Sequence, residues 1–250
     1  LELIKGTRIN KRKSLLFLDE IQKVSHVLAN LRWFYEESPE LPVITTGSLL
    51  DFVLKKHQFS MPVGRISYLF MEPMSFKEFL IANGEEILVE FIEKVKIGSS
   101  YPEPVHDKLL NYFSDYLAVG GMPAAVKEWI ETKSPVAVAE THQNLINTFI
   151  DDFNKYAGRV PHDRLHKVMM AVPRLIGKKF VFSNVDRGEN TKAIKQALEL
   201  LCSSRICHRI NHRAGRGLPL AAQENEKRFK VIFFDTGLVS ALQGLVLKST

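Results

Sequence analysis

The sequence predicts a mixed protein of 250 residues, with an α/β region first, a helical middle region and an α+β segment last. A short apolar run at 15–18 and a short β-branched run at 43–46 flank a helical pattern and so form a strand–helix–strand unit. Apolar residues at helical spacing fill residues 74–156. Lys and Arg gather after residue 160, where two further helices precede two strands.

The composition is that of a globular protein, with 45% apolar and 25% charged residues. No apolar run approaches the roughly 18 residues of a membrane span, and the first residues have no signal-peptide core. We therefore expect no membrane contact and a cytoplasmic location. Cys202 and Cys207 cannot form a disulfide framework, and no Cys or His cluster has zinc spacing.

The first strand is predicted at Leu15–Leu18, where four apolar residues follow one another without alternation. Such a run fits a strand of a parallel sheet that is buried on both faces. A helix is expected at 25–35 and a Pro-bounded break at 36–42. The second strand then covers Val43–Thr46, which completes the unit.

The middle region reads as a succession of helices. They are expected at 74–83, 85–96, 105–117, 122–131 and 136–156. Between the third and fourth, Gly120 and Gly121 supply the backbone freedom for a sharp turn.

Charge is distributed unevenly along the chain. Residues 1–160 hold 18 Lys and Arg against 21 Asp and Glu, a net −3, whereas residues 161–250 hold 16 against 7, a net +9. This asymmetry indicates a separate domain with an anionic partner, most simply nucleic acid. A basic surface that serves only solubility is the alternative.

The basic tail has the element order of a winged helix: helices at 165–176 and 191–203, a strand near 206–211, a glycine-containing loop at 213–219 and a strand at 231–234. In a winged helix the second helix enters the major groove of duplex DNA. The candidate nucleic-acid-binding residues are Thr191, Lys192, Lys195 and Gln196 on this helix, and Arg209, Arg213 and Arg216 on the strand and loop. Docking of a protein partner by the same domain is the competing interpretation.

Asp19 and Glu20 follow the first strand directly, which is the Walker B pattern of P-loop ATPases. The first carboxylate would hold Mg²⁺ on the nucleotide phosphates, and the second would orient and deprotonate the attacking water. Thr46 and Ser48 end the second strand, where a hydroxyl can bond the γ-phosphate or that water. The alternatives are an ordinary exposed strand end, and a Ser48 that caps the next helix.

Five blocks of the sequence, in order, resemble the prokaryotic AAA-like ATPases that carry a C-terminal domain of unknown function. The blocks are LLFLDEIQ at 15–22, ITTGSLL at 44–50, PVGRISYLFMEPMSFKEFL at 62–80, YLAVGGMPAAV at 116–126 and VIFFDTGLVSAL at 231–242. The resemblance implies that Asp19 is the metal-side acid, Glu20 the catalytic base, and Thr46 or Ser48 the sensor. Arg65 would face the nucleotide or a neighbouring subunit, or else pair with Glu72 or Glu78. ATP with Mg²⁺ is the implied cofactor, and self-association is implied as well.

The sequence departs from this family at one place: it contains no G-x-x-x-x-G-K-[ST] loop. We therefore expect an internal fragment of a switch ATPase, inactive alone. Its predicted parts are a partial P-loop ATPase core at 1–82, a helical region at 83–160 and a winged-helix-like basic domain at 161–250. The other hypothesis is a DNA- or protein-binding winged-helix module on an α/β scaffold.

Overall fold

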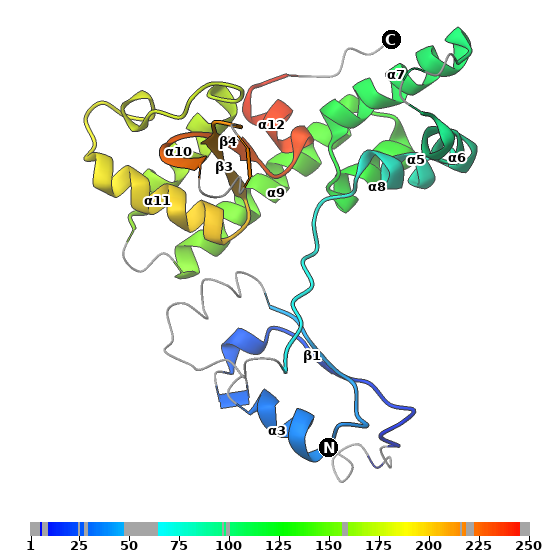
Figure 1. Ribbon diagram of the computed structural model, residues 1–250, viewed down its shortest axis with the longest axis vertical. Helices are drawn as coiled ribbons and strands as arrows, with labels where there is room; N and C mark the ends of the chain where they lie inside the picture. Colours follow the sequence, from blue (N-terminus) through cyan, green and yellow to red (C-terminus); the bar gives the residue numbers. More distant parts are fainter. Residues whose placement is uncertain are drawn as a thin grey trace. The chain divides into compact units, whose positions relative to one another are not determined.

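The computed structural model describes residues 6, 10–24, 26–27, 30–47, 65–96, 98, 101–156, 160–215, 217–218 and 223–245 (Figure 1). The chain forms two compact units, Leu1–Phe70 and Met71–Thr250. Within the described residues, no helix is both long and apolar enough to cross a membrane.

Unit 1 contains the predicted strand–helix–strand arrangement. Strand β1 (Leu16–Leu18) pairs in parallel with β2 (Val43–Thr45), in the register Leu16↔Val43 to Leu18↔Thr45. The 3-10 helix η1 (Ile21–Lys23) and helix α3 (Leu31–Glu37) lie between them in sequence.

Burial of this sheet on both faces was predicted and is wrong for the described residues. Phe17 is 55% exposed and Ile44 46% exposed. Helix α3, which lies between the two strands in sequence, has no fully buried residue either.

Unit 2 begins with the predicted helices: α5 (Phe76–Ala82), α6 (Glu86–Lys94), α7 (Glu103–Val119), α8 (Pro123–Thr132) and α9 (Pro135–Tyr156). Ser75 starts α5 with a capping box, in which its hydroxyl accepts from the Glu78 N–H and the Glu78 carboxylate accepts from the Ser75 N–H. The core between α5, α7, α8 and α9 consists of the buried residues Phe79, Val119, Ala125, Val126, Trp129 and Val138.

The basic part of unit 2 contains α10 (His162–Arg174), the 3-10 helix η2 (Phe182–Asn184), α11 (Thr191–Ser203), β3 (Cys207–Arg213) and β4 (Glu224–Phe233). The strands form an antiparallel hairpin with an irregularity between Asn211 and His212. The hairpin is longer than predicted. Residues 224–228 of β4 are all exposed and show no apolar alternation, so the sequence pattern did not indicate a strand there. The Phe180 N–H donates to the carbonyl of Phe229 at 2.9 Å, so residue 180 lies along the outer edge of β4.

The last described helix, α12 (Thr236–Leu242), packs on α7 and α9 of the helical middle region (Figure 1). The fold is therefore mixed α/β, with a short parallel sheet in unit 1, a mostly helical middle and an antiparallel hairpin near the C-terminus.

Candidate functional site

The two strand ends of unit 1 bring Asp19 and Thr46 into contact. Because β1 and β2 are parallel, their carboxyl ends lie at the same edge of the sheet. The Thr46 hydroxyl donates a hydrogen bond to the Asp19 carboxylate. The Ile21 N–H donates to the Thr46 carbonyl at 3.0 Å, which holds the chain after Asp19 against the end of β2.

Glu20 occupies a strained turn between Asp19 and η1. Its backbone has φ 53° and ψ 43°, the left-handed region that costs a non-glycine residue about 1–2 kcal/mol. Its N–H donates to the Asp19 carboxylate at 3.1 Å, and its own carboxylate lies 3.5 Å from the Lys23 ammonium. Strain of this kind concentrates at functional sites.

Arg65 pairs with a residue that the sequence interpretation did not consider. Its guanidinium lies 2.9 Å from the Glu36 carboxylate, which also accepts from Arg32 at 2.7 Å. The hydrogen bond from Arg32 and the charges of both arginines lower the pKa of Glu36. Glu72 and Glu78, the partners considered from the sequence, lie in unit 2, where Glu72 contacts Arg205 and Glu78 caps α5.

The donor set at the strand ends fits a hard cation. Asp19 and Glu20 offer carboxylate oxygens and Thr46 a hydroxyl oxygen, which are the ligand types that Mg²⁺ prefers. No group of three or more His, Cys, Asp or Glu residues within the described part of the chain could hold a metal by itself. Ser48, the other predicted sensor, lies outside the described residues.

The predicted nucleic-acid-binding residues of α11 share an exposed side of this helix. Thr191, Lys192, Lys195 and Gln196 are all exposed, and the Asn190 side chain caps the helix by accepting from the Lys192 N–H at 2.8 Å. The Lys195 ammonium lies 3.7 Å from the Glu199 carboxylate.

The predicted arginines of the hairpin make contacts within it. The Arg209 guanidinium lies over the Phe229 ring, 4.1 Å from its centroid, and donates to the Asn211 side chain at 2.9 Å. Arg213 pairs with Glu224 at 3.0 Å. Arg216 lies outside the described residues.

Sequence reasoning missed a buried contact between three of the five blocks. Asp235, only 3% exposed, accepts hydrogen bonds from the Gly121 N–H at 2.7 Å and the Leu238 N–H at 2.8 Å. The Met74 N–H donates to the Gly121 carbonyl at 2.7 Å. We call Met74, Gly121 and Asp235 the junction, because they join the start of α5, the α7–α8 turn and the start of α12. Two features of the sequence could have indicated this contact: the pair Gly120 and Gly121, and the Asp-Thr-Gly run at 235–237.

Asp235 gives the junction a pH dependence. Burial raises the pKa of its carboxyl, although the N–H donors of Leu238 and Gly121 and the charge of His142 oppose the shift. Because the pKa is raised in the folded state, ionisation of Asp235 destabilises the fold. The stability that Asp235 contributes is therefore complete below the ordinary Asp pKa and is lost as pH rises through its pKa in the folded state.

We expect the difference in unfolding free energy between the wild type and Asp235→Asn to shrink as pH rises above about 4, by about 1.4 kcal/mol for each unit of pKa shift. Urea unfolding of both proteins between about pH 4 and 7 measures this difference. A difference that grows with pH would mean that the N–H donors of Leu238 and Gly121 and the charge of His142 outweigh burial.

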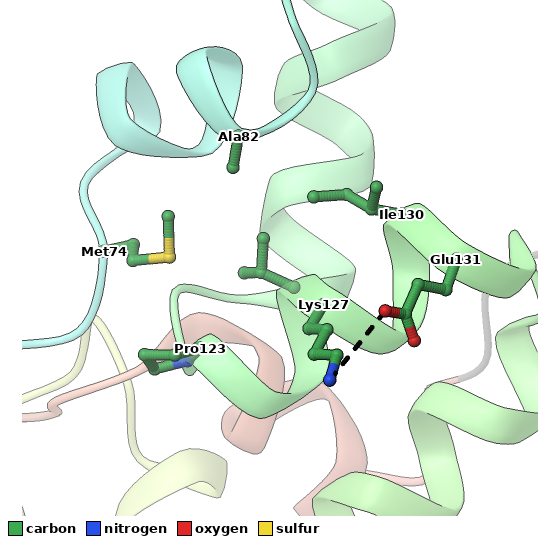
Figure 2. Close-up of a pocket in the computed structure, with 7 residues that line it drawn as sticks. Met74, Ala82, Pro123, Lys127, Ile130 and Glu131 are labelled. Atoms are coloured by element: carbon green, nitrogen blue, oxygen red, sulfur yellow. Dashed lines mark ion pairs between the residues drawn. The ribbon is translucent and has the colours of Figure 1, made fainter.

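A hollow between α5 and α8 does not have the chemistry of a nucleotide site. Figure 2 shows Met74 and Ala82 on the α5 side, and Pro123, Lys127, Ile130 and Glu131 on α8. The two charged residues lie 3.9 Å apart and pair with each other. The rest of the lining is apolar, so the hollow offers a single carboxylate, Glu131, which already pairs with Lys127.

Comparisons with known families define the class of the protein. Residues 1–80 match the family model of an AAA domain, the P-loop ATPase class that the strand ends of unit 1 indicated. Residues 110–249, more than half of the chain, match a domain of unknown function, DUF8612. The chain belongs to the DUF8612 family, and the resemblance to AAA-like proteins with a C-terminal domain of unknown function is confirmed. No curated protein and no solved structure matched.

Proposed function

We propose that unit 1 carries the hydrolytic side of an ATP site, in which Asp19 binds on the metal side, Glu20 is the base and Thr46 is the sensor. The observation that carries this proposal is the hydrogen bond between the Thr46 hydroxyl and the Asp19 carboxylate at the meeting ends of β1 and β2. The match to an AAA domain over residues 1–80 supports it.

Each residue has a separate task in the proposed reaction. Mg²⁺ would neutralise charge on the β- and γ-phosphates. Asp19 orients its oxygens towards that site, and Glu20 takes a proton from the attacking water. Thr46 acts as the sensor, because its hydroxyl can donate its hydrogen bond to a γ-phosphate oxygen in place of the Asp19 carboxylate. Ser48 is the second sensor candidate, and Arg65 reaches the nucleotide or a neighbouring subunit once it leaves Glu36.

These 250 residues are expected to bind ATP weakly or not at all. The backbone and lysine of the P-loop supply most of the phosphate affinity in such proteins, and the sequence contains no P-loop motif. Isothermal titration with ATP and Mg²⁺ measures the affinity. Micromolar binding would contradict the prediction and show that other residues cradle the phosphates.

We propose a second function, binding of duplex DNA by the basic part of unit 2. The element order supports a winged helix: α10, the Phe180 segment beside β4, η2, α11 and the β3–β4 hairpin follow in the order of that fold. The net charge of +9 in residues 161–250 supports an anionic partner.

Fluorescence anisotropy with a labelled duplex at low salt tests this second function. Sequence-independent binding has dissociation constants of about 1–100 μM at physiological salt, so tighter binding is expected at low salt. Tens of micromolar protein lies within about that range of dissociation constants. If no binding is seen at this concentration, docking of a protein partner remains as the function of this domain.

A further inference from the structure

The β3–β4 hairpin and the segment beside it hold a concentration of positive charge. The Phe180 segment lies beside β4 of the hairpin, and residues 178–181, 207–213 and 227–233 contain no Asp or Glu. The two acids of the strands, Glu224 and Glu226, lie at the start of β4. Each of the three acid-free stretches contains Lys or Arg. These stretches therefore carry only positive charge, whereas in α11 Lys195 pairs with Glu199.

The sheet has one face in the core and one outside. Phe229 and Val231 are buried, and Phe180 stacks on Phe229 with 5.8 Å between ring centroids. Strand residues alternate between faces, so Arg228 and Lys230 lie on the opposite, outer face. Lys230 is opposite Ile210 in the register, which places Ile210 on the outer face too.

The outer face extends to β3 and to the Phe180 segment on the two sides of β4. His208 is opposite Ile232, and the latter is 38% exposed. Lys179 and Val181 flank the buried Phe180 and are exposed. We call Lys179, Arg228 and Lys230, with His208, Ile210 and Ile232 between them, the outer sheet face.

The cations of the outer sheet face are available to a partner. Within the part of the chain that the structure describes, Lys179, Arg228 and Lys230 form no ion pair. By contrast, Arg213 is neutralised by Glu224 at 3.0 Å. A phosphate that contacts Arg213 would have to compete with this carboxylate, whereas a phosphate at Lys230 would not.

We propose that the outer sheet face, rather than the exposed side of α11, is the surface on which nucleic-acid phosphates bind; this rests on the proposed DNA-binding function of the domain. Protein–DNA interfaces are much more positive than protein–protein interfaces, whose cores are depleted of lysine. This face also exposes the apolar side chains Ile210 and Ile232, with Val181 beside them, so the preference for nucleic acid rests on its positive charge. The expected ligand is the phosphate backbone, bound without base specificity.

The test compares three variants of the 250-residue chain by fluorescence anisotropy, on a labelled duplex of about two helical turns. The first is Lys179→Gln, Arg228→Gln, Lys230→Gln. Each lost phosphate contact removes about 0.9 from the log–log salt slope, so the slope should fall by roughly 3 and the affinity at low salt at least about tenfold.

The matched control is Arg187→Gln, Lys192→Gln, Lys195→Gln, which removes the same charge from α11 and the loop before it. It should change the slope by less than about 1. A charge-preserving variant, Lys179→Arg, Arg228→Lys, Lys230→Arg, should bind like the wild type, which separates loss of charge from loss of fold.

The outcomes distinguish this inference from the function on which it rests. If the α11 variant loses binding and the sheet variant does not, the surface assignment is wrong and the DNA-binding function stands. If the wild type does not bind duplex at low salt, both fail. If polyglutamate competes as well as unlabelled duplex of equal charge, the face binds acidic proteins and the assignment to nucleic acid is overturned.

Discussion

Replacement of Gly121 by alanine is expected to lower the free energy of unfolding of unit 2 by about 3 kcal/mol. A Cβ at this position would lie 2.1 Å from the Met74 carbonyl oxygen and 2.7 Å from the Met74 nitrogen. Both neighbours are backbone atoms, so a side-chain rotation cannot relieve the overlap. The chain must separate there, which breaks the hydrogen bond from the Met74 N–H to the Gly121 carbonyl and disturbs the bond from the Gly121 N–H to Asp235.

Gly188→Ala is the matched control for this prediction. The nearest atom to a Cβ at Gly188 is the Asp186 carboxylate oxygen at 3.4 Å, which is ordinary contact with a flexible side chain. Its effect should lie within about 0.5 kcal/mol of zero. Urea unfolding of both variants measures the difference. Equal stability of the two would show that the junction tolerates separation and contributes little to the fold.

The second large effect is expected from Glu20→Gln in a chain that carries a P-loop segment ahead of Leu1. The amide keeps the shape of the side chain and loses its basicity, so ATP binding should persist while turnover falls about 10²- to 10⁴-fold. Steady-state hydrolysis together with nucleotide titration separates the two quantities.

Glu37→Gln, an exposed acid at the end of α3, is the control and should leave turnover unchanged. Asp19→Ala should instead weaken the dependence of turnover on Mg²⁺, because it removes a metal-side oxygen. Turnover that survives Glu20→Gln would mean that the strained turn at Glu20 serves the structure and that another group activates the water.

The placement of Asp19, Glu20 and Thr46 could be predicted because the signals are local. An apolar run followed by two acids specifies a strand and its end, and parallel pairing needs only the helix between the two strands. The direct bond between Thr46 and Asp19 follows from that pairing. The strained backbone of Glu20 could not be predicted, because it depends on how Ile21 bonds to the end of β2.

The partner of Arg65 and the state of the hairpin arginines could not be predicted either. Ion pairs depend on which side chains lie within a few ångströms, and many Asp and Glu residues of this chain are compatible with each arginine. In the folded chain Arg65 pairs with Glu36, and Arg213 pairs with Glu224. The consequence is a change in the expected binding surface, from α11 and its loop to the outer sheet face.

By itself, the sequence determined the helices of the middle region, the parallel strand pair and the basic character of the last third, because helical periodicity, apolar runs and charge are properties of neighbouring residues. The tertiary structure alone decided the junction, in which Gly121 and Asp235 meet across 114 residues of sequence. Burial of the Asp235 carboxylate against backbone N–H donors requires α7, α8 and α12 to be packed already, and no local pattern encodes that packing. The same holds for the sign of each surface, since a lysine becomes available to a partner only where folding has left no carboxylate beside it.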